Sequence, residues 1–304
     1  MTKTCAQLLS EFKGVGENPQ KLNFTGVGEN DVYNITAPFK QGEDWIIAGR
    51  VEARDSEHSK IVFFVEKGGN WVPKEGAATL TLQDPFFTFI GGELVLGGVE
   101  IYPHPENPAA LAWRTVFYKG QDIYSLAVFF KGPDGMKDLR LAELTDKSVA
   151  VVTRPQGEKG GRGKIGYVRI NNLSELTIQV VEDAPLLKGQ FIEEEWGGAN
   201  ELHLLKNGKL GILGHIASFS EGDVRHYYPM VFLLDPNTGA HTDIELIATR
   251  SQFLPGNSKR PDLVDVVFSG GLVRKADGTA DLYAGISDAE AHVITLKDPF
   301  LAYE

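Results

Sequence analysis

Acidic side chains that could transfer a proton recur along the chain, each beside a segment rich in β-branched and aromatic residues. Three are candidates for a catalytic role: Asp84 in "LQDPFF", Asp31 in "ENDVYN" and Glu201 in "NELHL". Glycosyl transfer is a reaction that such groups serve, because a carboxylic acid must protonate the leaving oxygen. Asp84 also has a simpler interpretation, since an aspartate before proline commonly begins a turn.

Basic side chains form a second group, suited to an anion such as phosphate or a carboxylate. Arginine donates two parallel hydrogen bonds to such groups, and lysine supplies a compact positive charge. The candidates for this role are Lys137, Arg154, His215, Arg54 and Arg140. Lys137 beside Asp138 could instead form a surface ion pair. His215 lies within an apolar segment, where a hydrogen-bonded core histidine is common.

Further polar residues could contact the remainder of a ligand. They are Asn34, Arg50, Asp138, Asn200, Tyr227, Asp265 and Asp288. Carboxylates suit sugar hydroxyls, cations suit phosphate, and aromatic side chains, 10% of the sequence, could stack on sugar rings. Glycosyl transfer to or from phosphate would use all three kinds. No metal site is expected, because His203 and His215 have no third ligand at a helpful spacing.

The segment Gly161-Arg-Gly-Lys-Ile-Gly166 matches the pattern G-x-G-x-x-G literally. A dinucleotide loop needs a strand before these glycines and a helix after them. Here "SVAVVTR" precedes and "YVRI" follows, so both flanks favour strands and the glycines indicate a hairpin connection. A P-loop is also excluded, because Lys164 is followed by Ile165 where Ser or Thr is needed. Arg162 could reach over a ligand site or lie at a solvated tip.

Composition narrows the class of protein. The chain has 304 residues, 42% hydrophobic content and a net charge of −11, which argues against a general nucleic-acid binder. The single cysteine, Cys5, excludes an internal disulfide. No apolar run has the length of a signal peptide core or a membrane span. We therefore expect a cytoplasmic protein with a small-molecule ligand and neither nucleic acid nor membrane as partner; the sequence does not indicate its oligomeric state.

Only the first dozen residues predict a helix, with Thr4 and Gln7 spaced as a capping box. Beyond them, short β-rich runs alternate with Gly, Asn, Asp and Pro clusters, which is typical of an all-β fold. Five segments share a polar stretch followed by strand–turn–strand, and they predict a single five-bladed β-propeller over residues 1–304. The expected blades are residues 22–80, 81–131, 132–185, 186–250 and 251–304. In such a fold the innermost strands meet at a central funnel, which would bring the polar candidates together.

Five motifs, in this order, resemble those of glycoside hydrolase family 130, the mannoside phosphorylases, and of the related β-1,2-mannosyltransferase/phosphorylases of glycosyltransferase family 108. The motifs are "RDSEHSKIVFFVEKGGNW", "LQDPFFTFIGGELVLG", "GMKDLRL…VVTRPQGE", "KLGILGHIA…YYPMVFLLDP" and "DVVFSGGLV…DLYAGISDAEAHVIT". The likeness extends from about Asn23 to Thr295.

The resemblance implies an inverting glycoside phosphorylase that cleaves a β-linked mannoside with inorganic phosphate and needs no cofactor. Asp84 matches the general acid, whose proton is thought to pass through a sugar hydroxyl. Lys137 and Arg154 match cations near the phosphate, His215 the active-site histidine, and Asp288 the aspartate of the closing motif. Two departures stand out. Phe86 replaces an arginine after Asp-Pro, and the histidine motif reads Leu-Gly-His in place of Tyr-His-Gly.

Other functions stay open on sequence alone. An inverting hydrolase would need a carboxylate base across the ring, roughly 6.5–9.5 Å from the acid, and Asp31, Glu201 or Asp265 could supply it. Two or more cations at that place would favour phosphorolysis instead. A sugar-nucleotide-dependent transferase and a propeller that binds carbohydrate or a protein partner without chemistry are the remaining alternatives.

Overall fold

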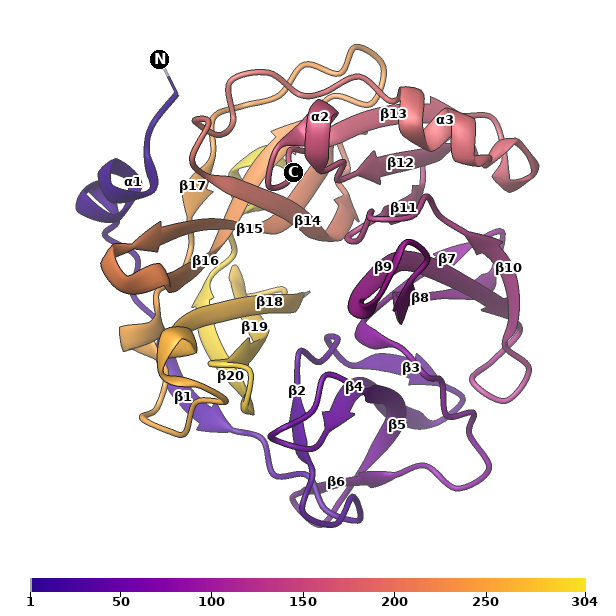
Figure 1. Ribbon diagram of the computed structural model, residues 1–304, viewed down its shortest axis with the longest axis vertical. Helices are drawn as coiled ribbons and strands as arrows, with labels where there is room; N and C mark the ends of the chain where they lie inside the picture. Colours follow the sequence, from indigo (N-terminus) through magenta and orange to yellow (C-terminus); the bar gives the residue numbers. More distant parts are fainter. Residues whose placement is uncertain (1) are drawn as a thin grey trace.

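The computed structural model describes residues 2–304, which form mostly β-strands with few helices. Four hydrogen-bonded sheets are arranged around a common centre (Figure 1). The predicted predominance of β-structure is confirmed. The first sheet contains β2 (Asp31–Tyr33), β3 (Phe39–Gln41), β4 (Asp44–Glu52), β5 (Ser59–Lys67) and β6 (Asn70–Pro73). The second contains β7 (Gln83–Ile90), β8 (Glu93–His104), β9 (Asn107–Gly120) and β10 (Ala127–Lys131).

The third sheet has three strands, β11 (Arg140–Glu143), β12 (Val149–Thr153) and β13 (Gly166–Ile170). β12 and β13 pair antiparallel, from Val149 opposite Ile170 to Thr153 opposite Gly166. The glycine-rich segment therefore connects two paired strands. This confirms the hairpin interpretation over the dinucleotide loop.

The fourth sheet has eight strands in two antiparallel meanders. One contains β14 (Trp196–Leu204), β15 (Leu210–Ser220), β16 (Val224–Leu234) and β17 (Glu245–Leu246). The other contains β18 (Asp265–Arg274), β19 (Thr279–Ile286), β20 (Glu290–Lys297) and β1 (Glu17–Lys21). A parallel pairing of β16 with β18, at only His226–Asp265 and Tyr227–Val266, joins the two. Because β1 pairs with β20, the N-terminal segment completes the last meander.

Helix α1 (Cys5–Glu11) begins at the predicted capping box of Thr4 and Gln7. The sequence pattern does not predict α2 (Gly157–Gly160) or α3 (Ile178–Asp183), because neither is long enough to show a helical period. Short 3₁₀ turns occur in the connections: η1 (Leu173–Glu175), η2 (Glu221–Asp223), η3 (Arg250–Gln252), η4 (Pro261–Leu263) and η5 (Leu301–Tyr303). Among residues 2–304, no helix has the length and apolar character needed to cross a membrane.

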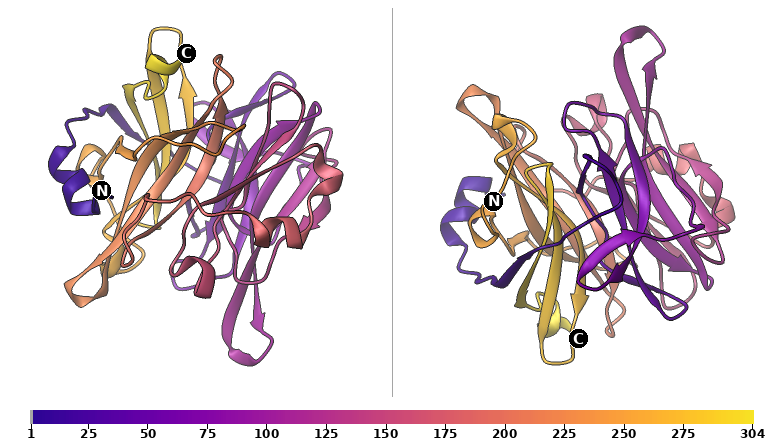
Figure 2. Two further views of the ribbon diagram at one scale, coloured as in Figure 1. Left: turned by 90° about the horizontal axis from the view of Figure 1, so that it is seen from above. Right: turned by 90° about the horizontal axis from the view of Figure 1, so that it is seen from below.

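The apolar core lies between neighbouring sheets. Phe63 and Leu96 pack between the first and second sheets, and Phe117 and Val151 between the second and third. One strand from each meander approaches a strand of the next: β4 to β7, β7 to β11, β11 to β14 and β14 to β18. Two hairpins, β8–β9 and β15–β16, project from one side of the molecule, opposite the C-terminus (Figure 2).

Candidate active site

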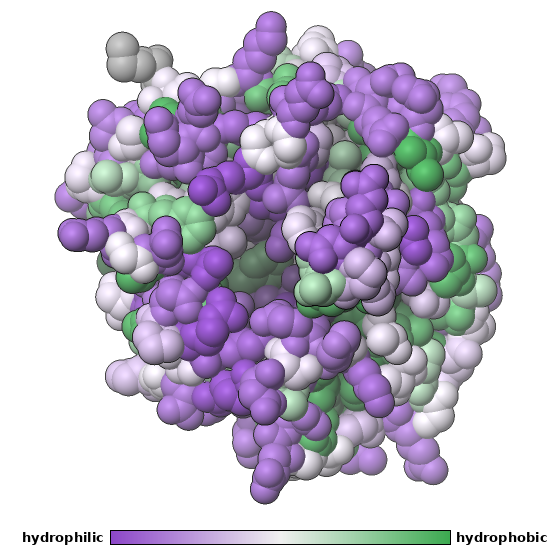
Figure 3. Space-filling view, viewed as in Figure 1, coloured by the Kyte–Doolittle hydropathy of each residue, from purple (hydrophilic) through white to green (hydrophobic). Residues whose placement is uncertain are grey.

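A cavity of about 210 Å³ lies where β4, β7, β11, β14 and β18 approach one another. The space-filling view shows the face hollowed near its centre, on the side from which the two hairpins project (Figure 3). All five meanders supply lining residues: Asn34, Arg50, Glu57, Gln83, Asp84, Lys137, Asp138, Arg154, His215, Arg225, Tyr227, Arg260, Leu263, Val266, Phe268 and Asp288. Nine of the sequence-predicted residues are therefore brought together: Asp84, Lys137, Arg154, His215, Asn34, Arg50, Asp138, Tyr227 and Asp288.

Asp84 is presented by an irregularity in β7. The pairing of β7 with β8 shifts register between Gln83 and Phe86, and Asp84 has a φ of +48°. Such bulges re-aim a side chain. The Oδ1 atom of Asp84 accepts hydrogen bonds from Asn34 Nδ2 at 2.8 Å and from Arg50 Nη1 at 3.0 Å. The turn interpretation of the Asp-Pro pair is thus partly correct, but the strained residue also faces the cavity.

Arg50 is fixed by partners on three sides. Its Nη2 donates to Glu52 at 2.6 Å, its Nε donates to Ser59 at 2.9 Å, and its guanidinium lies 4.8 Å from the centre of the Tyr33 ring. Glu52 also accepts from Lys259, at 2.5 Å. Because every partner is itself held by the fold, Arg50 positions Asp84 rigidly.

Asp288 occupies the tight turn between β19 and β20, where it and Ser287 have φ values of +50° and +54°. Burial raises the pKa of Asp288 above its ordinary value. Arg50 opposes this shift, whereas the charge of Asp84 adds to it. The cavity therefore contains a carboxyl group that holds its proton to a higher pH than a free aspartic acid.

Arg154 is the deepest cation, with 2% of its surface exposed. Its Nε donates to the carbonyl of Gly197 at 2.9 Å and its Nη2 to the carbonyl of Arg162 at 3.3 Å. Its Nη1 has no hydrogen-bond partner among the described residues and lies 3.4 Å from Asp138 Oδ2. A buried donor without a partner is costly, which is expected where a ligand supplies the acceptor.

The glycine-rich segment packs directly against this arginine. Gly163 has a φ of +145°, and a Cβ atom there would lie 2.6 Å from the Arg154 guanidinium. A Cβ atom at Gly198 would lie 2.7 Å from Arg154 Cδ. Glycine is thus required at 163 and 198 because the backbone there approaches a buried cation.

Asp138 and Arg140 lie beside Arg154. Burial disfavours the charged form of Asp138, but the charges of Arg154 and Arg140 outweigh this and lower its pKa. Arg140 does not line the cavity. It donates to the carbonyls of Asn200 and Leu139, and its guanidinium lies 4.4 Å from the centre of the Phe86 ring. Phe86, one of the two departures from the family motif, thus supports a second-layer arginine.

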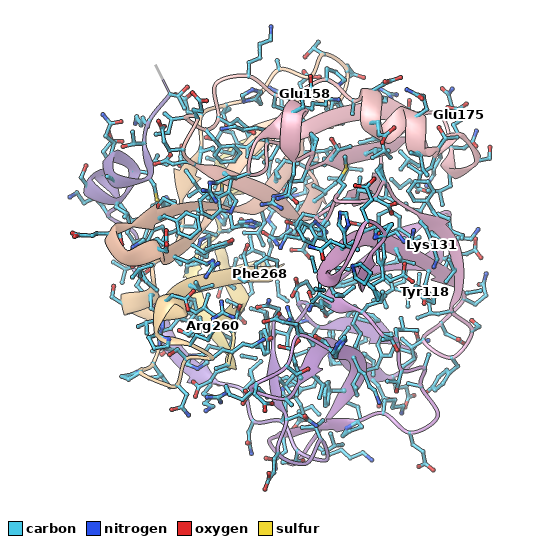
Figure 4. All side chains as sticks on the ribbon, in the orientation of Figure 1. Tyr118, Lys131, Glu158, Glu175, Arg260 and Phe268 are labelled. Carbon is cyan, nitrogen blue, oxygen red and sulfur yellow. The ribbon has the colours of Figure 1, made fainter. Side chains whose placement is uncertain are left out.

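His215 is 1% exposed and stacks between Tyr227 and Phe268, with ring centres 5.4 and 5.3 Å away. Its Nδ1 lies 2.9 Å from Asn200 Oδ1. Burial is the main cause that lowers the pKa of His215 to about 3; Asp138 opposes the shift, and Arg154 and Lys137 add to it. The imidazole is therefore neutral near neutral pH. Figure 4 shows Phe268 close to the centre of the molecule and Arg260 farther out.

The remaining predicted residues lie outside the cavity. Asp31 pairs with Arg54, Glu201 accepts from the backbone nitrogen of Leu272 at 2.7 Å, and Asp265 contacts His226 at 2.7 Å. Arg140 and Asn200 lie one layer behind the lining. None of Asp31, Glu201 and Asp265 lines this cavity.

Several lining residues had weak or no sequence signals. Arg225 belongs to the polar stretch "RHYYP" and Arg260 to "KRPDLVD". The clustering of charged residues in these stretches is a usable signal. Glu57 follows a charged run in the loop after β4, and Gln83 directly precedes Asp84. Phe268 lies within the apolar strand "DVVFS" and looks like any core residue. Within residues 2–304 no group of three or more His, Cys, Asp or Glu side chains could hold a metal ion.

Residues 11–302 match the family model described as "Protein of unknown function (DUF1861)". The chain belongs to the DUF1861 family. Comparison with curated protein sequences gives no match.

Solved structures resemble this DUF1861 chain over nearly its whole length. A mannose phosphorylase from Leishmania mexicana, in complex with a phosphate ion, is 34% identical over 99% of this chain and 93% of its own, with a TM-score of 0.87. A GDP-Man-dependent mannosyltransferase from the same organism is 29% identical, covers 99% and 96%, and has a TM-score of 0.89. A β-1,2-mannobiose phosphorylase from Listeria innocua, 13% identical over 97% and 95% with a TM-score of 0.65, shows a likeness of fold. The resemblance that the motifs indicated is confirmed.

Proposed function

We propose that this DUF1861 protein is an inverting glycoside phosphorylase that acts on β-1,2-linked mannosides and releases mannose 1-phosphate. We further propose that residues 1–304 form one five-bladed propeller domain. The two meanders of the eight-stranded sheet count as separate blades, because only two residue pairs join them. The likeness to a mannose phosphorylase supports the substrate class.

The observation that carries this proposal is the presence of two cations, Lys137 and Arg154, in the lining of the cavity. Arg154 has a buried Nη1 without a hydrogen-bond partner among the described residues, and the charges of both cations act on Asp138 and His215. Asp138 neutralises only part of this charge. A phosphate dianion fits such a place, because guanidinium and ammonium groups both donate to its oxygens.

The reaction follows from this arrangement. A phosphate oxygen held by Lys137 and Arg154 attacks the anomeric carbon of the mannosyl unit, and the bond from that carbon to the leaving oxygen breaks. The proton from Asp84 reaches the leaving oxygen, directly or through a sugar hydroxyl. Attack from the opposite face inverts the β-linkage, so the product is α-mannose 1-phosphate and a glycan shortened by one unit.

The contacts of Asp84 are compatible with this role. Oδ1 accepts from Asn34 and Arg50, so a proton can reside on Oδ2 without breaking either hydrogen bond. Asp288 in the same cavity has a raised pKa. We assign Asp84 as the proton donor, with Asn34 and Arg50 as residues that orient it and Asp288 as a substrate-binding carboxyl.

Hydrolysis is less well supported, because the three carboxylates predicted as a base lie outside the cavity lining and contact other partners: Asp31, Glu201 and Asp265. Transfer from a sugar nucleotide is a second candidate, because a GDP-Man-dependent mannosyltransferase shares the fold over 99% of this chain. Both the phosphorylase and the transferase would use the same anion site, one for phosphate and the other for a diphosphate.

The test is incubation of the protein with β-1,2-mannooligosaccharides, with and without inorganic phosphate, assaying mannose and mannose 1-phosphate. Phosphate-dependent mannose 1-phosphate, lost by a factor of about 10³ or more in Asp84→Asn, would support the proposal. Free mannose in both arms would favour hydrolysis. A third arm with GDP-mannose and the same glycans as acceptors would reveal chain extension if the protein is a transferase.

A further inference from the structure

The cavity is too small for more than a short part of a glycan. Its volume of about 210 Å³ falls below the ~300–1,000 Å³ typical of ligand pockets, and that space must also admit phosphate. Any sugar units beyond those at the reacting bond must therefore lie outside the cavity, on the surface around its mouth.

A hollow of about 660 Å³ is lined by residues that adjoin two cavity residues in the chain: Met136 precedes Lys137, and Pro155 follows Arg154. A further hollow of about 390 Å³ lies along the β8–β9 hairpin, up to its tip at Pro105, and shares Trp113, Asp134 and Gly135 with the first. We call these two hollows together the arm groove. The β8–β9 hairpin that lines its outer part projects from the molecule (Figure 2).

Trp113 is fixed in the middle of the arm groove. Its indole Nε1 donates to the carbonyl of Gly135 and to Gln156 Oε1, both at 3.1 Å, and the ring is half-buried. A rigid aromatic ring whose polar atom is already satisfied offers its face to a ligand at little entropic cost. The C–H face of a pyranose packs well on such a ring.

Tyr102 is a second ordered aromatic side chain, in the outer part of the arm groove. Its hydroxyl donates to Asp134 at 2.5 Å, and the Arg114 guanidinium lies 4.6 Å from the ring centre. Asp134 and Gln156 add polar groups that suit sugar hydroxyls. Ordered aromatic faces interspersed with polar side chains are the composition of a carbohydrate-binding surface rather than of a core protein interface, which excludes charged groups.

We propose that the arm groove binds the sugar units of an oligosaccharide that lie beyond the cavity, with Trp113 as the main stacking platform. This rests on the proposed action on mannosides and extends it to chain length: the protein would prefer glycans long enough to reach Trp113 over the disaccharide. The occupant is inferred from two observations: the groove is lined by chain neighbours of Lys137 and Arg154, and the cavity is too small to hold further sugar units.

The test measures binding of β-1,2-mannooligosaccharides of increasing length by calorimetry, in the Asp84→Asn background so that no turnover occurs. Affinity is expected to rise about tenfold between the shortest and the longest glycans, since an aromatic contact contributes about that much. Trp113→Ala should reduce this rise to about twofold or less, with the disaccharide as internal reference. Trp45→Ala is the matched control, because Trp45 is also a half-exposed tryptophan but lies on β4 away from the groove.

Trp113→Ala could also disturb the local fold, because the Trp113 indole donates to the carbonyl of Gly135, two residues before Lys137. A second variant therefore tests the groove without removing that hydrogen bond. Leu111→Asp changes an exposed residue, 41% accessible, at the outer end of the groove and should likewise weaken long glycans selectively. Affinity that does not depend on length, or a length dependence unchanged by both variants, would overturn the groove proposal. If the unsubstituted protein turns over the disaccharide but Asp84→Asn shows no gain in affinity for longer glycans, the groove alone is overturned. If the unsubstituted protein turns over no glycan and Asp84→Asn binds none, the proposed function is overturned as well.

Discussion

His215 shows how burial, together with neighbouring charges, sets the chemical state of one side chain in the cavity. Its pKa is lowered to about 3, so the folded protein keeps the imidazole neutral at a pH where the unfolded chain takes up a proton. That difference makes the unfolded state bind more protons between about pH 6.5 and 3. The free energy of unfolding should therefore fall as the pH falls below about 6.5.

The prediction is a loss of up to about 1.4 kcal/mol of stability per pH unit from this residue, measured by urea unfolding at pH 7 and pH 5. His215→Asn should flatten this dependence, while His58→Asn, at an exposed histidine, should leave it as in the unchanged protein. An unchanged slope in His215→Asn would contradict the assigned neutral imidazole.

Several cavity residues could be predicted because they are polar groups next to apolar, strand-forming segments. Asp84 before Pro85 and Lys137 beside Asp138 are polar groups at the start of apolar strands, and the structure places them in one cavity. Asp31 and Glu201 have similar local sequences but face other partners. Which polar residue at a strand end faces the centre depends on register and bulges, which local sequence does not specify.

At the scale of elements, the β12–β13 connection packs against Arg154, a residue of the proposed anion site. Gly163→Ala would put a Cβ atom 2.6 Å from the Arg154 guanidinium and displace it. A small displacement of a binding group costs catalysis heavily, so the KM for phosphate should rise about tenfold or more. Steady-state kinetics at varied phosphate would measure this.

Gly161→Ala is the matched control for that prediction. Gly161 also has a positive φ, +58°, but a Cβ atom there would meet no atom within 4 Å. It therefore carries the same kind of backbone strain without the contact to Arg154. If both variants raised KM equally, strain in the loop rather than the contact with Arg154 would be responsible.

The hairpin nature of this element was predictable from the strands on either side, whereas α2 was not. Four residues cannot show a helical period, and the turn of α2 is closed by Gly157 and Gly161, which exchange backbone hydrogen bonds at 2.8 Å. Gly163 and Arg154 are near in sequence, but their close approach was not predictable. It depends on the direction of the Arg154 side chain, which the pattern of glycines does not specify.

At the scale of the whole molecule, a buried ion pair between Lys259 and Glu52 connects the first and last meanders beside the cavity. Lys259, from the loop before β18, donates to Glu52 on β4 at 2.5 Å and to the carbonyl of Ser56 at 2.7 Å. The side chains of Lys259 and Glu52 are 5% and 0% exposed. Removing one partner of a buried ion pair is costly, and without Lys259 the buried Glu52 would keep only Arg50 as a cationic partner.

Lys259→Met should therefore reduce the free energy of unfolding by about 2–4 kcal/mol, as measured by urea denaturation. Lys147→Met is the comparison, because its ion pair with Glu143 is 79% exposed on the lysine side and should change stability by less than about 0.5 kcal/mol. Equal effects of the two substitutions would contradict the stabilising role of the Lys259–Glu52 ion pair.

The predominance of strands and the order of the five segments were predictable from alternating apolar runs and turn residues. The joining of two meanders into one eight-stranded sheet was not. It depends on a parallel pairing of β16 with β18 across two residue pairs, between segments separated by a long connection. Pairings of that kind leave no periodic trace in either segment.

In the proposed mechanism, phosphate is the nucleophile and approaches opposite the leaving group. This is tested most directly by following β-1,2-mannobiose and inorganic phosphate by proton and phosphorus NMR during the first turnovers. The mechanism predicts α-mannose 1-phosphate and mannose as the first products, in equal amounts. Mannose without any sugar phosphate, or a β-configured mannose 1-phosphate, would contradict it.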